Sequence, residues 1–298
     1  MIDRGVWYGL EFDAVLFSAM GLLYYIYYRL RPKRQTRTPA ISGEMIRLKA
    51  RLRRLVRPTL LLVPAKEPGF SKIGGSPELP AGQKWPVVSD EPRSFLAQID
   101  LETLAPHAVI DWLPKAGRFY AFYDCEGHGR ADVVRIVYSL EPAGAPVAAP
   151  AGVRFQFGER RVAFMVFTSA PSLDWLGLDV ADLDLDEDEF EQLEAIGDAP
   201  PPDELQHRIG GYPNEIQPEV MPLSCEHLAR GLPDPVWGED IPPAIARAAK
   251  EWRLLLQIDS DPALKMNFGD GGRLYVFIRE RHARAGNFSK TVAMWQTY

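Results

Sequence analysis

The chain has 298 residues, of which 46% are hydrophobic and 25% charged, and its formal net charge is −6. This composition excludes a disordered tail and is typical of a globular protein of one large or two ordinary domains. The 24 Gly and 26 Pro indicate many turns. Only two cysteines, Cys125 and Cys225, are present, and no Cys/His cluster has the spacing of zinc ligands. The sequence therefore predicts no disulfide framework, no metal site and no cofactor.

Residues 29–57 hold a dense cluster of positive charge. They contain eleven Lys or Arg and one acid, Glu44, so this stretch carries +10 and the rest of the chain −16. A short basic element attached to an acidic body indicates contact with an anionic surface.

Directly before this stretch, residues 14–28 form a run of fifteen residues without a charge. A helix of this length spans about 22 Å, short of a hydrocarbon core of about 30 Å. Snorkelling of Arg29 and Arg31, and placement of the upstream Val6, Trp7, Tyr8 and Leu10 in the outer interface, extend it. We therefore predict a membrane anchor over residues 1–30. Positive residues lie only on its C-terminal side, which predicts a single-pass inner-membrane protein with a cytoplasmic body. The alternative is a short helix packed on the protein's own surface.

Residues 31–57 are predicted to form a basic juxtamembrane element. Apolar residues recur in it at helical spacing, at Met45, Leu48, Leu52 and Leu55. This spacing predicts a helix over residues 42–56, whose other faces carry five basic residues and favour contact with anionic lipid. Nucleic acid is the rival partner, but aromatic residues are not interleaved with the basic ones as stacking platforms. The predicted partner is therefore the membrane, through residues 14–28 and 42–56, and not nucleic acid.

An internal repeat follows, visible as three short matches that occur in the same order in both halves of the body. The matched pairs are residues 72–77 with 208–213, 95–100 with 254–259, and 117–122 with 272–277. Their offsets are 136, 159 and 155 residues, so loops and helices are inserted unequally. We predict that residues 58–298 form one domain of two repeats, about 58–140 and 151–298. The expected fold is α+β, with mostly antiparallel strands, inserted helices and a preceding N-terminal helix.

The second and third matches are typical of strands, and each places polar side chains on one strand face. The favoured interpretation is that these side chains satisfy backbone groups where the halves meet, because buried polar groups must be paired. The alternative is a ligand-binding surface. Its candidate residues are Gln98, Asp100, Arg118, Tyr120, Gln257, Arg273 and Tyr275.

Several motifs together resemble one known family. They are SKIGG-P-LP with a following Trp-Pro (71–86), FLAQID (95–100), GRFYAFYD (117–124), H-IGGYP-IQ (207–217), LLLQIDSD (254–261) and GDGG-LYVFI (269–278). In this combination the chain resembles the YwqG-like family, a bacterial domain of unknown function, over about residues 58–296. The resemblance implies an α+β fold with an internal duplication. It implies no reaction, because no activity is established for that family.

Among the positions that the repeated motifs align, His207 is the one at which the second repeat adds a group that titrates near neutral pH, since it aligns with Ser71 of the first. Asp259, Asp261 or Asp270 is placed to orient it as a general base, which makes a hydrolase the alternative function. That function requires the imidazole within about 3 to 4 Å of a carboxylate at the floor of a pocket. The favoured interpretation is that His207 caps or packs beside the Gly-Gly turn, because no nucleophile motif accompanies it.

The acidic stretch 182–189 begins like a calcium-binding loop, but Glu187 stands where that loop needs Gly and Leu193 where it needs Glu. We expect instead that Asp186 or a neighbour caps a helix through Phe190, Leu193 and Ile196.

The function that the sequence favours is a membrane-tethered cytoplasmic binding module, regulatory or immunity-type, for a protein or small-molecule ligand. An enzyme is the less favoured class, because neither a nucleophile motif nor a metal-spacing pattern is present. The ligand, any reaction and the oligomeric state stay open at this point.

Overall fold

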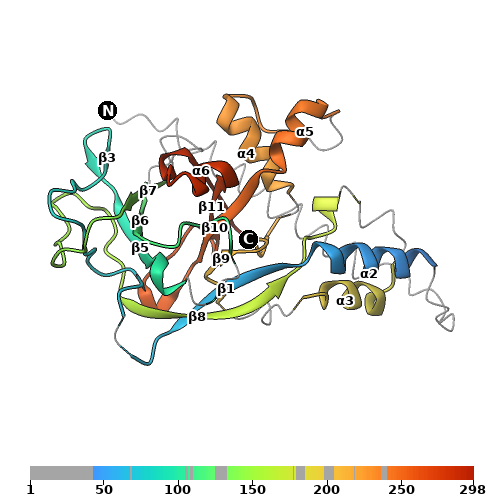
Figure 1. Ribbon diagram of the computed structural model, residues 1–298, viewed down its shortest axis with the longest axis horizontal. Coiled ribbons are helices and arrows are strands. Elements are labelled where there is room, and N and C mark those ends of the chain that lie inside the picture. The colour runs from blue at the N-terminus through green and yellow to red at the C-terminus, as the bar shows by residue number, and fades with distance from the viewer. Residues whose placement is uncertain are drawn as a thin grey trace, which may run out of the picture.

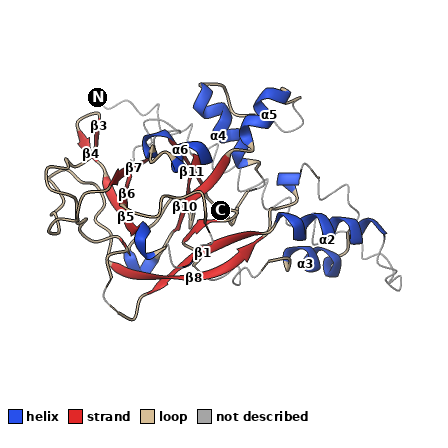
Figure 2. Cartoon of the chain, in the orientation of Figure 1, coloured by secondary structure: helices blue, strands red, loops and turns tan. Residues whose placement is uncertain are grey.

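The computed structural model describes residues 43–298 except 68, 105–106, 108–109, 125–132, 177, 179–184, 198–204, 218 and 236–239 (Figure 1). Its main feature is a ten-stranded sheet in which neighbouring strands are antiparallel. Figure 2 shows this sheet with helices set around it. The expectation of mostly antiparallel strands is confirmed. Over the described residues the fold is mostly β, so the α+β label is confirmed only in part.

Two paired strands form the centre of the sheet, and four strands extend it on each side. The central pair is β1 (Arg57–Pro64) and β8 (Arg160–Ser169). On one side lie β2 (Lys72–Ile73), β5 (Ser94–Asp100), β6 (Arg118–Tyr123) and β7 (Val134–Ser139). On the other side lie β9 (Arg208–Gly210), β10 (Trp252–Asp259), β11 (Arg273–Arg279) and β12 (Thr291–Gln296). A separate hairpin consists of β3 (Val87–Val88) and β4 (Glu91–Pro92).

The described helices lie in the connections and at the ends of the sheet. The α-helices are α2 (Gly43–Leu55), α3 (Glu187–Glu194), α4 (Met221–Arg230), α5 (Pro243–Ala249) and α6 (Glu280–Arg284). Single 3₁₀ turns cover η1 (Leu101–Thr103), η4 (Asp174–Leu176), η6 (Pro262–Leu264) and η7 (Phe288–Lys290).

The strand order is mirrored about the central pair: β12-β11-β10-β9-β1-β8-β2-β5-β6-β7. The register is the same on both sides. Gln98 lies opposite Tyr120 as Gln257 lies opposite Tyr275, and both β5 and β10 carry a register shift at the same point of the strand. Polar residues at matching positions of the two repeats therefore occupy matching positions in the sheet.

One continuous core joins the two halves. Ile73 and Phe119 of the first half, and Ile209 and Leu255 of the second, belong to the same buried cluster, and each has no exposed surface. The edge strands β7 and β12 also approach one another, and the ring of Tyr138 packs 4.7 Å from that of Phe288. The sheet is therefore curved until its two edges nearly meet.

Helix α2 and helix α3 lie side by side at one end of the molecule (Figure 1). The helix expected over residues 42–56 is confirmed as α2, and its apolar residues Met45, Leu48 and Leu52 are buried. They pack against Leu173, Leu193 and Ile196. Arg47, Arg51, Arg53 and Arg54 are exposed.

The predicted cap of α3 is confirmed. The Asp186 carboxylate accepts a hydrogen bond from the Glu189 N–H at 2.8 Å, and the Glu189 side chain reaches back to the Asp186 N–H. This reciprocal arrangement satisfies backbone donors that the first turn of a helix leaves without partners.

The prediction of a single-pass inner-membrane protein is contradicted. In the part of the chain that the structure describes, no helix is long and apolar enough to cross a membrane. Helix α2, for example, has 13 residues and exposes several arginines. The residues predicted as the anchor, 1–30 with the apolar run 14–28, lie outside the described residues. We therefore withdraw the prediction of a transmembrane helix, together with the inner-membrane and cytoplasmic placement that was derived from it.

We predict that the apolar face of α2 stabilises the folded body. Leu52 is 1% exposed, so Leu52→Ala removes packing atoms from a closed cluster and should lower the free energy of unfolding by about 2 to 5 kcal/mol. Ile46 on the same helix is 57% exposed, and Ile46→Ala is the matched control with an expected change below about 0.5 kcal/mol. Urea denaturation measures both. Equal effects of the two substitutions would show that α2 is not packed as described.

Candidate functional site

The polar strand residues of the first half hold the loop that follows β2. The Gln98 side chain accepts a hydrogen bond from the Glu78 N–H at 2.9 Å and donates one to the Phe70 carbonyl at 2.8 Å. The Tyr120 hydroxyl donates to the Glu78 carbonyl at 2.9 Å. Burial raises the pKa of Tyr120 to about 12, so this hydroxyl keeps its proton. Both side chains are fully buried and engaged with backbone groups.

The second half repeats the contacts to the loop, although the Gln257 amide donates to the Asp259 carboxylate at 2.8 Å and to the Gln206 carbonyl at 3.4 Å. The Gln257 side chain accepts a hydrogen bond from the Asn214 N–H at 2.9 Å, and the Tyr275 hydroxyl donates to the Asn214 carbonyl at 2.9 Å. Burial also raises the pKa of Tyr275 well above its usual range. The polar side chains at these four positions therefore anchor loops and present no face to a ligand.

The remaining predicted ligand-binding residues form ion pairs at the ends of the same strands. Arg118 lies 3.6 Å from Asp100, and Arg273 lies 3.4 Å from Asp259. Arg273 also donates to the Asn214 carbonyl at 2.9 Å. Each pair links two adjacent strands, so these residues also have a structural role.

His207 occupies the position that Ser71 occupies in the first half. Its Nδ1 accepts a hydrogen bond from the Asp259 N–H at 3.0 Å, just as the Ser71 hydroxyl accepts one from the Asp100 N–H at 3.0 Å. Because Nδ1 is an acceptor, the neutral ring carries its proton on Nε2. That nitrogen lies 3.6 Å from the Asp261 carboxylate.

Asp261 is the acid that faces His207. It caps η6 by accepting a hydrogen bond from the Ala263 N–H at 3.0 Å, and it forms an ion pair with Arg160. The neighbouring His207 first, and Arg160 second, lower the pKa of Asp261 to about 2 although burial acts in the opposite direction.

The structure thus brings His207 together with Asp259 and Asp261 but not with Asp270. Asp270 is exposed in the turn before β11, whereas His207 and Asp261 are 2% and 1% exposed. His207 lines neither the hollow beside the β3–β4 hairpin nor the hollow along α2 and α3. The imidazole meets the distance expected of a general base, but it lies in the interior with its Nδ1 occupied by a backbone donor.

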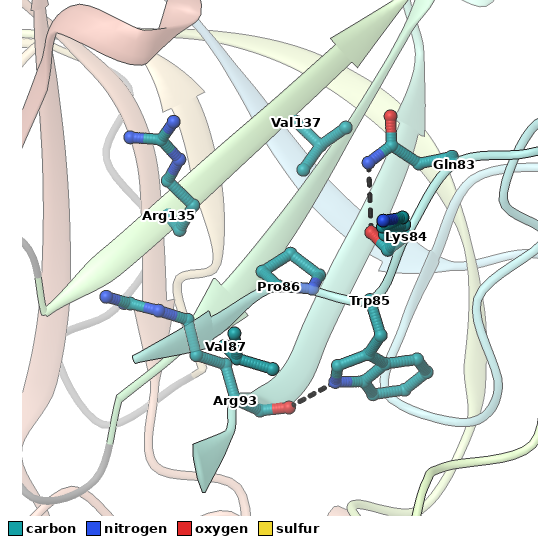
Figure 3. A pocket seen from close by; sticks show the side chains of 8 residues that line it. All are labelled: Gln83, Lys84, Trp85, Pro86, Val87, Arg93, Arg135 and Val137. Carbon is teal, nitrogen blue, oxygen red and sulfur yellow. Dashed lines mark hydrogen bonds between the residues drawn. The ribbon is translucent and has the colours of Figure 1, made fainter. Parts of the chain in front are cut away.

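An open hollow of about 430 Å³ lies beside the β3–β4 hairpin and is called here the Trp85 hollow. It is lined by Gln83, Lys84, Trp85, Pro86, Val87, Arg93, Arg135 and Val137 (Figure 3). None of these lining residues is acidic and three are cationic. Figure 3 shows the side chains of Arg93 and Arg135 extending to the same side, with Lys84 and Trp85 on the other.

Aromatic packing fixes the wall of the Trp85 hollow. The Trp85 indole donates a hydrogen bond to the Arg93 carbonyl at 2.9 Å, and its ring packs edge-on against Phe122 with the centroids 5.2 Å apart. Lys84 and Arg135 are exposed, whereas Arg93 is 3% exposed. A second hollow, about 460 Å³, lies along α2 and α3 and includes Lys49 and Arg53.

Sequence reasoning missed the Trp85 hollow. The Trp-Pro dipeptide at residues 85–86 was a signal, because it is part of the motif on which the family resemblance rests, but nothing near it in the chain indicates Arg135. That residue comes from β7, which reaches the hollow only through strand pairing.

Comparison with known protein families identifies the family of this chain. Residues 71–297 match the model of a domain of unknown function, DUF1963, and the chain belongs to that family. No curated protein matches it. The match covers both repeats and leaves α2 outside.

We predict that Asp261 contributes to stability in a pH-dependent way. Its pKa is depressed in the folded state, so its contribution is present above pH 4 and is lost as the pH falls towards 2. Asp261→Asn should therefore lower the free energy of unfolding at pH 7 by about 2 kcal/mol. The difference from the wild-type protein should shrink between pH 4 and pH 2. Urea denaturation across this range measures it, and a difference that stays constant with pH would contradict the assignment.

Proposed function

We propose that the protein is a binding module and that the Trp85 hollow is its recognition site for a small anionic molecule with a flat apolar part. The observation that carries the proposal is the lining itself, which contains three cations, no acid and an indole ring. The volume falls at the lower end of the range of small-molecule sites.

The chemistry of the lining supports an anionic ligand. Guanidinium groups bind planar oxyanions with two parallel hydrogen bonds, and Arg135 is exposed and free to reorient toward one. The faces of Trp85, Pro86 and Val87 supply apolar contact beside those charges. A molecule that joins an aromatic ring to a phosphate or carboxylate matches both features.

The binding class is favoured over the hydrolase alternative by the geometry of His207. A general base must reach the proton that it abstracts, but His207 is buried and its Nδ1 already accepts the Asp259 N–H. A regulatory or immunity-type role without a reaction, and without nucleic acid as a partner, remains our expectation.

We further propose that residues 58–298 are an internal duplication and that the chain is a YwqG-like member of its family. The mirrored strand order and the equal register of the two halves support the duplication. The motifs between residues 71 and 278 support the narrower family name.

We predict that phenyl phosphate and benzoate bind at the Trp85 hollow. Titration of either compound should shift the indole N–H resonance of Trp85, assigned through Trp85→Phe, in a saturable way with a dissociation constant in the millimolar range. Arg135→Glu should weaken binding about tenfold, because it replaces an attractive charge with a repulsive one.

Lys250→Glu is the matched control, because it makes the same change of charge at an exposed position directly after α5 and outside the hollow. It should leave the dissociation constant unchanged. Phenol tests the need for the anion and should bind more weakly than phenyl phosphate. An unchanged affinity in Arg135→Glu, or equal binding of phenol and phenyl phosphate, would refute the proposed site.

A further inference from the structure

The short strands β2 and β9 each begin with a buried cation at the same place in the sheet. Lys72 lies opposite Gln98, and Arg208 lies opposite Gln257. The two side chains are 1% and 2% exposed. A buried cation without an opposite charge is costly, so the acids around each one decide its stability.

In the first half this charge is neutralised within the chain. The Lys72 ammonium lies 2.9 Å from the Glu159 carboxylate and 3.4 Å from that of Glu78. Arg161 lies 3.0 Å from Glu78 and completes a network of two acids and two bases. The charge of the Lys72 ammonium is therefore neutralised by carboxylates of the chain itself.

In the second half both of those acids are replaced by neutral residues. Asn214 takes the place of Glu78, since the N–H of each donates to the strand glutamine and the carbonyl of each accepts from the strand tyrosine. Thr59 takes the place of Glu159: a Cβ built on Gly211 would meet Thr59, as one on Gly75 would meet Glu159.

Arg208 is consequently left with a spare donor. It donates to the carbonyl oxygens of Tyr212 at 3.1 Å and Gln206 at 3.3 Å, but its Nη2 atom has no hydrogen-bond partner. Burial lowers the pKa of Arg208 to about 10. The Nδ2 atom of Asn214 is also buried and without a partner.

The Asp259 carboxylate does not provide a hydrogen-bond partner for Nη2 of Arg208. The Asp259 carboxylate accepts hydrogen bonds from the Gln206 N–H and the Gln257 side chain, and it lies 3.4 Å from Arg273. No ion pair of Arg208 with an acid occurs among the residues that the structure describes.

We propose that the loop after β9 is a site for a small carboxylate anion, bound by Nη2 of Arg208 and Nδ2 of Asn214. The anion takes the position that the Glu78 carboxylate takes beside Lys72. Two N–H donors from different side chains match the two oxygens of a carboxylate. This site is in the opposite half of the sheet from the Trp85 hollow and does not rest on it.

The test is thermal unfolding of the full chain in a buffer free of carboxylates, with sodium acetate added at constant ionic strength against sodium chloride. Acetate at about ten times its dissociation constant should raise the melting temperature by roughly 3 °C beyond chloride. Arg135→Glu should keep this response, which separates it from binding at the Trp85 hollow. A response to acetate no greater than that to chloride would overturn the proposal.

Asn214→Asp is the decisive variant, because it supplies the carboxylate from the chain as the first half does. Its melting temperature without acetate should exceed that of the wild-type protein, and its acetate response should disappear. Asn267→Asp makes the same chemical change at an exposed position and should keep the acetate response. If Asn214→Asp keeps the response, or is less stable than the wild-type protein, no anion site exists beside Arg208.

Discussion

The side-chain amides of Gln98 and Gln257 are the contacts on which both halves of the sheet depend. Each is fully buried and joins a core strand to the loop that starts beside it. Such a loop carries backbone N–H and C=O groups that lose water on folding and must find partners. An amide offers a donor and an acceptor, so one side chain serves both ends of the loop. The same residue therefore recurs at the same register although the connecting segments differ.

Much of this arrangement was predictable from the sequence. The repeated strands, the apolar face of α2 and the cap at Asp186 depend on spacing along the chain, which the sequence displays directly. The alignment of His207 with Ser71 was also predictable, because both stand next to a repeated Ile-Gly-Gly. What spacing could not show is that both residues accept the N–H of a strand aspartate, a contact that follows from the pairing of distant strands.

The Trp85 hollow was not predictable for the same physical reason. Lys84, Arg93 and Arg135 come from three segments, and β7 brings Arg135 into place only by pairing with β6. Isolated basic residues far apart in the chain look like an ordinary solvated surface in a sequence. The charge cluster that the sequence did reveal, part of which lies on α2, was conspicuous because its residues are close together in the chain, and the apolar face of α2 packs on the body.

The two halves share their hydrogen-bonding geometry and differ in charge. Residues that anchor the loops are alike in both, since any change would leave buried backbone groups without partners. The buried cations Lys72 and Arg208 can be neutralised in more than one way, because the negative charge can come from the chain or from a bound anion. Lys72 is a compact charge that two carboxylates surround, whereas Arg208 uses two donors on carbonyl oxygens and has another to spare. Asn214 and Thr59 stand where the first half has its two acids, and the loop keeps its fold. The Arg208 guanidinium then still requires a negative charge, and this requirement is the physical basis of the proposed anion site.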